Sequence, residues 1–201
     1  NDEVGMFAAT WSGSQEIGAI IVQALDRIGE DGLIELERSP LSTPLGLDFV
    51  EGVTLPKGYL SPYFLHGQTG TSIQLIKPYV LLTDWELSDP DDLLPILEQL
   101  VEREHPALLV LAADVSGGAL SLLTANNSRG AIRCVAVRAP DVNEYQSALL
   151  DDLAVWTGGK FISKATGALP RFALLDDLGR ARRTYIDANE TTIIDGNGES
   201  T

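Results

Sequence analysis

Short apolar runs and longer amphipathic stretches alternate along most of the sequence. Four apolar runs have the length of buried strands: residues 79–82, 107–112, 132–137 and 160–162. Three stretches between them have helical spacing: residues 90–104, 116–126 and 144–157. Such alternation predicts parallel strands joined by right-handed crossover helices, which is an α/β fold. Residues 180–187 and 191–194 add two terminal strands, which we expect to form a hairpin.

The first fifty residues predict a small unit of their own. Apolar residues recur at three- and four-residue spacing after Ser14, which predicts an amphipathic helix with a serine cap. Alternating apolar and acidic residues at 33–37 and 47–51 predict two half-buried antiparallel strands. Gly52 closes this unit, either as a permissive turn residue or as a hinge.

Composition and charge exclude several classes of protein. Hydrophobic residues make up 44% of the 201 positions and charged residues 21%, which is typical of a globular chain and not of a disordered one. The 14 basic and 29 acidic residues give a net charge of -15. Nucleic acid and anionic membrane surfaces would repel such a chain, so we expect neither as a partner.

The expected compartment is the cytoplasm. The longest apolar run, residues 107–113, is far shorter than the roughly 20 residues that a membrane helix needs. Cys134 is the only cysteine, so no disulfide can form within the chain, and its apolar neighbours predict a core residue. The chain begins at Asn1 and ends in a loop-like segment, so we expect it to be a fragment of a longer protein.

Catalytic and metal-binding patterns are sparse. His66 and His105 have no second histidine or cysteine at ligand spacing, so we expect neither to bind a metal. The acidic residues around Pro90 fit a helix start better than a cation site. The adjacent pairs Asp151-Asp152 and Asp176-Asp177 point to different faces and are predicted to be solvated. We expect no catalytic residues, no metal and no cofactor in this fragment.

Surplus apolar residues on two predicted helices suggest a binding surface. The helix at 90–104 has two apolar stripes: Leu93, Ile96 and Leu100 in the first, and Leu94, Leu97 and Val101 in the second. One stripe suffices for a core, so the second stripe can face a partner. The next helix carries Leu120 and other apolar residues, and two such neighbours would form a groove for a peptide. Burial of both helices by another domain is an equally good interpretation.

One long motif resembles a known family. It consists of Glu51-Gly52 followed by Lys57-Gly58-Tyr59-Leu60-Ser61-Pro62-Tyr63-Phe64. This motif resembles the segment that opens the apical domain of group I chaperonins, the GroEL-like proteins, and further matches follow in order from residue 4 to 199. The resemblance implies that residues 1–51 are part of the intermediate domain and residues 52–201 the apical domain without its C-terminal part. It also makes Gly52 an interdomain hinge.

The resemblance implies that the chain captures non-native polypeptides on an apolar surface, which can also bind a co-chaperonin loop. The implied binding residues are Tyr59, Tyr63, Phe64, Leu94, Leu97, Val101, Leu120, Thr124 and Ala125. ATP and magnesium are implied for an equatorial domain that this fragment lacks, so the full-length parent is expected to be an ATPase. The parent is expected to form a homo-oligomeric ring, and the fragment a monomer.

Departures from the family pattern indicate a divergent member. Thr124 and Ala125 stand where chaperonins usually have two valines, and residues 141–147 lack the basic run that the family has there. An alternative from another class is a small α/β ligand-binding or enzymatic domain with a groove for a small molecule. The second stripe offers Leu but no convergent acid, base or nucleophile, which favours polypeptide binding.

Overall fold

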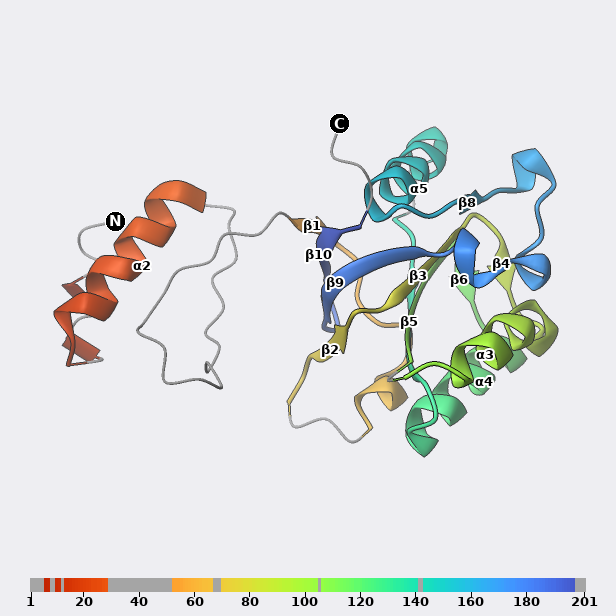
Figure 1. Cartoon of the computed structure of the whole chain (residues 1–201), viewed down its shortest axis with the longest axis horizontal. Coiled ribbons are helices and arrows are strands. Elements are labelled where there is room, and N and C mark those ends of the chain that lie inside the picture. The colour runs from red at the N-terminus through yellow and green to blue at the C-terminus, as the bar shows by residue number, and fades with distance from the viewer. Residues whose placement is uncertain are drawn as a thin grey trace. The chain divides into compact units, whose positions relative to one another are not determined.

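The protein is described from a computed structural model, which describes residues 6–7, 10–11, 13–28, 52–66, 70–104, 106–140 and 143–197. The chain divides into two compact units, Asn1–Phe49 and Val50–Thr201 (Figure 1). The division lies close to the boundary expected at Gly52, which is the first residue of strand β1 (Gly52–Leu55). The strands predicted at 33–37 and 47–51 lie outside the described residues.

The first unit contains helix α2 (Gln15–Ile28), which confirms the helix predicted there. The Ile17 N–H donates a hydrogen bond to Ser14 Oγ at 3.4 Å, so the serine caps the first turn as expected. Ala24 is buried, whereas Glu16 and Arg27 are exposed at the two ends. Their charges have the signs that the helix dipole favours at those ends.

The second unit is an α/β structure with a parallel centre, as the sequence predicted. Strand β5 (Ala107–Ala112) pairs in parallel with β3 (Tyr79–Thr83) on one side and β7 (Arg133–Arg138) on the other. Strand β8 (Phe161–Ile162) pairs in parallel with the end of β3. Every residue of β5 is buried, because elements cover both faces of this part of the sheet.

Antiparallel strands complete the sheet, which is therefore mixed and not purely parallel. Strands β9 (Gly179–Ile186) and β10 (Thr191–Gly196) form the predicted hairpin. Strand β1 pairs with β10, and β2 (Ile73–Ile76) pairs with β9, both antiparallel. The sequence analysis missed β1 and β2 because each has only four residues. A two-stranded parallel pair, β4 (Glu86–Leu87) and β6 (Asp114–Val115), lies outside this sheet.

Three helices of this unit were predicted, and one has different bounds. Helix α4 (Gly117–Arg129) and helix α5 (Asn143–Thr157) confirm the predictions, and α5 lies on the opposite side of the sheet from α3 and α4 in Figure 1. The single helix expected at 90–104 is wrong: a 3-10 turn, η2 (Pro90–Asp92), precedes α3 (Leu94–Val101). The Asp91 N–H donates to Asp89 Oδ1 at 3.0 Å, so Asp89 caps the turn and not a long helix.

Short 3-10 turns complete the unit. They are η1 (Pro62–Leu65), η3 (Lys164–Thr166), η4 (Pro170–Phe172) and η5 (Leu175–Asp177). In the described part of the chain, no helix has both the length and the apolar character that crossing a membrane requires.

The end of α5 packs closely on the start of β9. A Cβ on Gly159 would overlap the backbone of Gly179, and a Cβ on Gly179 would overlap the Thr157 side chain. The Thr157 hydroxyl is buried and donates to the Leu153 carbonyl at 2.7 Å. The two glycines therefore let a helix end and a strand approach more closely than any side chain allows. This contact explains the Thr-Gly-Gly motif at 157–159.

A row of buried and half-buried side chains crosses the antiparallel strands and contains one polar group. Val53, Ile193, Thr184 and Leu75 lie opposite one another on four strands, and Thr184 is fully buried. The Thr184 hydroxyl has no hydrogen-bond partner among the described residues. A buried hydroxyl without a partner loses its hydration and gains nothing in exchange.

We therefore expect Thr184→Val to raise the free energy of unfolding by about 1 kcal/mol, since it removes the unpaired hydroxyl and keeps the shape. Urea denaturation of the chain and the variant measures this difference. Thr192→Val is the control, because the Thr192 hydroxyl lies 3.0 Å from Thr54 Oγ1 and shares a hydrogen bond with it. A loss of stability in Thr184→Val would show that this hydroxyl has a partner after all.

Candidate functional site

The segment after β1 is held against the sheet by its backbone. The Tyr59 N–H donates to the Asp187 carbonyl at 3.0 Å, and the Leu60 N–H donates to the Ala136 carbonyl at 2.9 Å. A Cβ on Gly58 would overlap the backbone of Asp187 and Ala188. The glycine of the Lys-Gly-Tyr motif thus allows this close approach, and it leaves Tyr59 half-buried against the core.

The 3-10 turn η1 exposes one aromatic side chain and buries the next. The Tyr63 N–H donates to Ser61 Oγ at 3.3 Å, which caps the turn before Pro62. Phe64 is fully buried, whereas Tyr63 is 73% exposed. Asn127 of α4 donates from Nδ2 to the Phe64 carbonyl at 3.0 Å, so the turn is fixed to that helix. Tyr63 is therefore the accessible aromatic residue of this segment.

Helix α3 carries both core and surface apolar side chains. The predicted first stripe is core, since Leu93, Ile96 and Leu100 are fully buried. Of the second stripe, Leu94 is 38% exposed and Val101 is 55% exposed. The expectations for Leu97 and Phe64 as surface residues are wrong, because both are buried. Leu97 follows Leu93 by four residues and precedes Leu100 by three, so it shares their buried face and packs into the core.

Helix α4 presents a less apolar surface. Leu120, Thr124 and Ala125 are all half-buried, and Leu120 packs against the core. The Thr124 hydroxyl donates to the carbonyl of Leu120, 3.0 Å away, or of Ser121, 3.1 Å away. This bond within the helix satisfies the Thr124 hydroxyl, so the half-buried position needs no other polar partner.

The elements that carry these residues are linked by direct contacts. Helix α4 contacts both η1 and η2, and α3 contacts η2. The Ala119 N–H donates to the Ser88 carbonyl at 3.1 Å, and a Cβ on Gly118 would overlap the Pro90 ring. The start of α4 is thus held against the turn that leads into α3. Of the nine expected binding residues, three are exposed and four half-buried: Tyr63, Leu94 and Val101, and then Tyr59, Leu120, Thr124 and Ala125.

Two exposed apolar residues were missed by the sequence analysis. Phe172 is 73% exposed and Leu174 is 59% exposed, and both lie beside α3. The segment that carries them has neither helical nor strand spacing over enough residues, so periodicity gave no signal. The signal that was present is an alternation, since Ala173 and Leu175 between and after them are buried.

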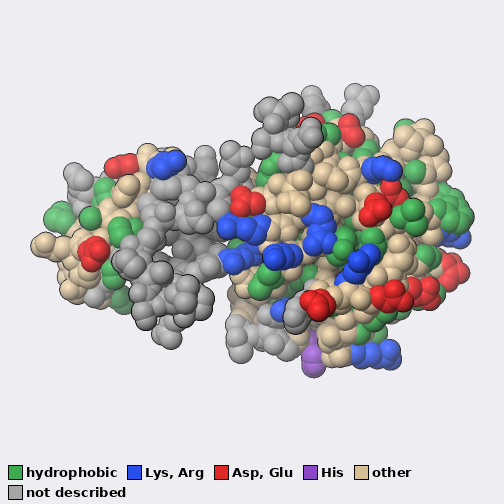
Figure 2. All heavy atoms as spheres, viewed as in Figure 1, with side chains coloured by type: hydrophobic (Ala, Val, Ile, Leu, Met, Phe, Trp, Pro, Cys, Tyr) green, Lys and Arg blue, Asp and Glu red, His purple; other side chains and the backbone are tan. Residues whose placement is uncertain are grey.

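Charge is unevenly distributed over the second unit. In Figure 2 acidic side chains gather over α3, whereas Lys and Arg side chains gather over β9. On β9, Arg182 Nε lies 2.8 Å from Asp195 Oδ2, and the Arg180 guanidinium lies 3.8 Å from the centre of the Tyr79 ring. The basic side chains of β9 are thus engaged by neighbours within the sheet.

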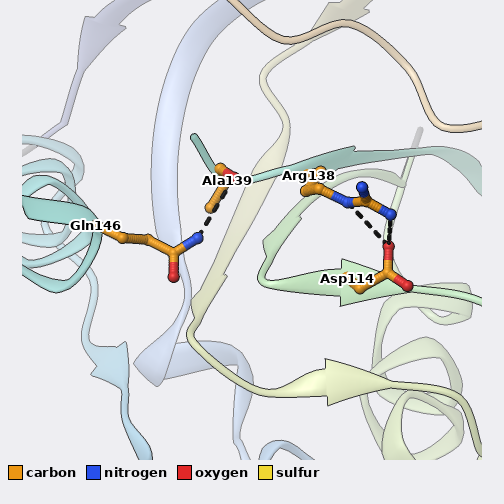
Figure 3. Close-up of polar contacts among 4 residues, drawn as sticks. All are labelled: Asp114, Arg138, Ala139 and Gln146. Carbon is orange, nitrogen blue, oxygen red and sulfur yellow. Dashed lines mark hydrogen bonds and ion pairs between the residues drawn. The ribbon is translucent and has the colours of Figure 1, made fainter. Parts of the chain in front are cut away.

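The carboxyl ends of the parallel strands, where α/β folds commonly bind small molecules, hold polar groups that bond to one another. In Figure 3 Arg138 at the end of β7 points to Asp114, and its Nε lies 3.1 Å from Asp114 Oδ1. Gln146 of α5 donates to the Ala139 carbonyl at 3.3 Å. Asp84, after β3, accepts from Ser163 Oγ at 2.9 Å.

The two histidines and the cysteine singled out in the sequence lie in different surroundings. His66 is exposed, and His105 lies outside the described residues. Cys134 is fully buried as predicted, and burial raises the pKa of its thiol. No group of three His, Cys, Asp or Glu residues that could hold a metal occurs within the ranges the structure describes.

No protein-family model matches this sequence.

Leu94 and Leu97 provide a direct test of which side chains are core. We expect Leu97→Ser to lower the free energy of unfolding by roughly 2 to 5 kcal/mol, because it empties a buried position. Leu94→Ser should change it by no more than about 0.5 kcal/mol, because the side chain is partly in solvent. Thermal and urea unfolding of both variants measure the difference. Equal stabilities would mean that Leu97 is not packed as described.

The ion pair between Lys160 and Asp177 gives a pH-dependent prediction. Lys160 Nζ lies 2.7 Å from Asp177 Oδ1, and the Leu174 N–H donates to Oδ2 of the same carboxylate at 2.9 Å. These hydrogen bonds, that from Lys160 first, hold the pKa of Asp177 below its ordinary value. The carboxylate therefore contributes stability above the unfolded pKa of about 3.9, and this contribution is lost as the pH falls through the lower folded pKa.

We expect Lys160→Met to raise the titration midpoint of the Asp177 carboxyl, measured by NMR, toward the ordinary value. The backbone bond from Leu174 remains in this variant, so the midpoint should stay somewhat low. Lys164→Met is the control, because Lys164 lies 5.6 Å from the Trp85 ring and not against Asp177. An unchanged midpoint in Lys160→Met would contradict the ion pair.

Proposed function

We propose that this chain is the polypeptide-binding module of a divergent group I chaperonin. The observation that carries the proposal is that Tyr63, Leu94 and Val101 are exposed apolar residues on linked elements, in a chain whose motif at 57–64 resembles the apical domain. Apolar contact contributes roughly 25 cal/mol per Å² buried and has no preferred direction, so such a surface tolerates many client sequences. Non-native polypeptides are the ligand class that fits it.

The proposal extends to the assembly. The unit Val50–Thr201 would be most of the apical domain, and Asn1–Phe49 part of the intermediate domain, with Gly52 as the hinge. ATP and magnesium would bind an equatorial domain, and the parent would work as a homo-oligomeric ring in the cytoplasm. Each client site would be weak, because a flexible client loses entropy on binding, and a ring of sites would gain by avidity. A co-chaperonin loop would compete for the same surface.

The alternative, a small-molecule or enzymatic α/β domain, lacks a supporting observation. Its usual site would be at the carboxyl ends of the parallel strands. There, Arg138 bonds to Asp114 and Ser163 to Asp84, so the described polar groups at this edge are engaged with one another.

The test compares two exposed valines that differ in position. Val101 of α3 is 55% exposed and Val155 of α5 is 59% exposed, so serine at either position should leave the fold intact. We expect Val101→Ser to weaken suppression of aggregation of a chemically denatured client, measured by light scattering without nucleotide. Val155→Ser should match the unmodified chain. Equal activity of the two variants, or no suppression by the unmodified chain, would overturn the proposal.

A further inference from the structure

A second apolar surface lies on the flank of α3 that carries Gln99. Gln99 Oε1 accepts from the Leu175 N–H at 3.3 Å, and its Nε2 lies 3.5 Å from the Ala173 carbonyl. In η2, before α3 begins, Asp92 Oδ1 lies 2.8 Å from Arg171 Nη2. The segment 171–175 therefore runs along α3 from the start of the helix toward its end. These contacts hold the segment against the helix. Phe172 and Leu174 project from this segment into solvent.

The backbone beneath this surface is held by hydrogen bonds and by buried neighbours. Ala173 and Leu175, which flank Leu174, are buried, and the Leu174 N–H is held by Asp177 Oδ2 at 2.9 Å. The segment enters from the buried Pro170, which fixes one backbone angle. The backbone that carries Phe172 and Leu174 is thus already ordered when a partner docks. Docking therefore costs less conformational entropy than docking onto a flexible segment would.

Unpaired carboxylates border this surface. Asp91 of η2, Glu98 of α3 and Asp176 of η5 are exposed, and among the described residues none of the three is in an ion pair. Two basic residues lie near these carboxylates, and both are in ion pairs: Arg171 with Asp92, and Lys160, which is also close enough to interact with Asp176, with Asp177. Figure 2 shows acidic side chains over this part of the unit. An apolar surface with a negative border attracts a partner that is apolar and positively charged.

We propose that the surface formed by Phe172, Leu174 and the neighbouring face of α3 docks a cationic amphipathic peptide segment. Apolar side chains of the segment cover Phe172 and Leu174, and its lysines or arginines face Asp91, Glu98 and Asp176. Anionic lipid and nucleic acid are disfavoured by the same carboxylates. The surface stands whether or not α3 and α4 capture clients, because its anchors come from a different segment of the chain.

The test uses two synthetic amphipathic peptides with the same Leu and Phe residues and either Lys or Glu at every polar position. We expect the Lys peptide to bind the full chain at least about tenfold more tightly at low salt, measured by fluorescence anisotropy. The preference should shrink in roughly 1 M salt, where the screening length is about 3 Å. Equal affinities at low salt would overturn the proposal.

Matched variants locate the site. Leu174 and Val155 are each 59% exposed, and Val155 has Asp151 and Asp152 one turn away but no second exposed large hydrophobic residue among the described side chains of α5. Leu174→Ser should weaken binding of the Lys peptide about fivefold or more, and Val155→Ser should not. Glu98→Gln should reduce the Lys-over-Glu preference. Melting curves confirm that each variant is folded.

The two proposals can fail separately. If Val101→Ser abolishes client protection while the Lys peptide still depends on Leu174, both proposals stand as distinct surfaces. If the chain protects no client but binds the Lys peptide through Leu174, only the proposed function fails. If Lys-peptide binding falls in Val101→Ser and not in Leu174→Ser, the peptide uses the other flank of α3 and this inference is wrong.

Discussion

The second unit depends on the pairing of strand β9, because this strand joins the parallel part of the sheet to the antiparallel part. Its first residues, Gly179 and Arg180, pair with β3 of the parallel part, and residues 183–186 pair with β2 of the antiparallel part. Between these two regions Lys77 has a φ of 49° and its N–H donates to the Arg182 carbonyl at 2.9 Å. On the other side Asp195 has a φ of 48° and its carboxylate holds the Arg182 guanidinium. Both neighbours of Arg182 thus adopt a backbone conformation that non-glycine residues rarely take, and the ion pair and backbone bond stabilise the junction.

The elements of this fold that are completely buried could be predicted from the sequence. Strand β5 has the predicted bounds, because a strand covered on both faces is a continuous apolar run with no competing pattern. Strands β1 and β2 could not be predicted, since four residues between turn residues become a strand only by pairing with β10 and β9. The prediction of a single helix at 90–104 was wrong, because capping by Asp89 and the prolines Pro90 and Pro95 favour a turn before α3.

The candidate surface was only partly predictable, and the reason is geometric. Apolar residues at three- and four-residue spacing indicate which side chains share a helix face. They do not indicate how much of the helix surface the core covers. On α3 the core includes Leu97 and ends before Leu94 and Val101. The same eight-residue helix thus stabilises the fold through one face and exposes apolar area on the other. In η1, adjacent residues divide in the same way, with Phe64 in the core and Tyr63 in solvent. Whether a residue of η1 lies in the core or in solvent depends on how α4 packs against the turn. The local sequence pattern carries no information about that packing.

The apolar surface beside α3 differs between its two flanks. On α4, Thr124 uses its hydroxyl to bond to its own helix, and Ala125 offers little apolar area. On the other flank, Phe172 and Leu174 expose large side chains that are held in place by buried neighbours. A small apolar area beside α4 gives only weak apolar contacts, and contacts that depend on area alone are the least selective. Apolar area bordered by Asp91, Glu98 and Asp176 favours partners that carry positive charge, because wrongly charged partners are repelled at the border. Under the docking proposal, the flank with Phe172 and Leu174 therefore selects partners by charge as well as by apolar contact.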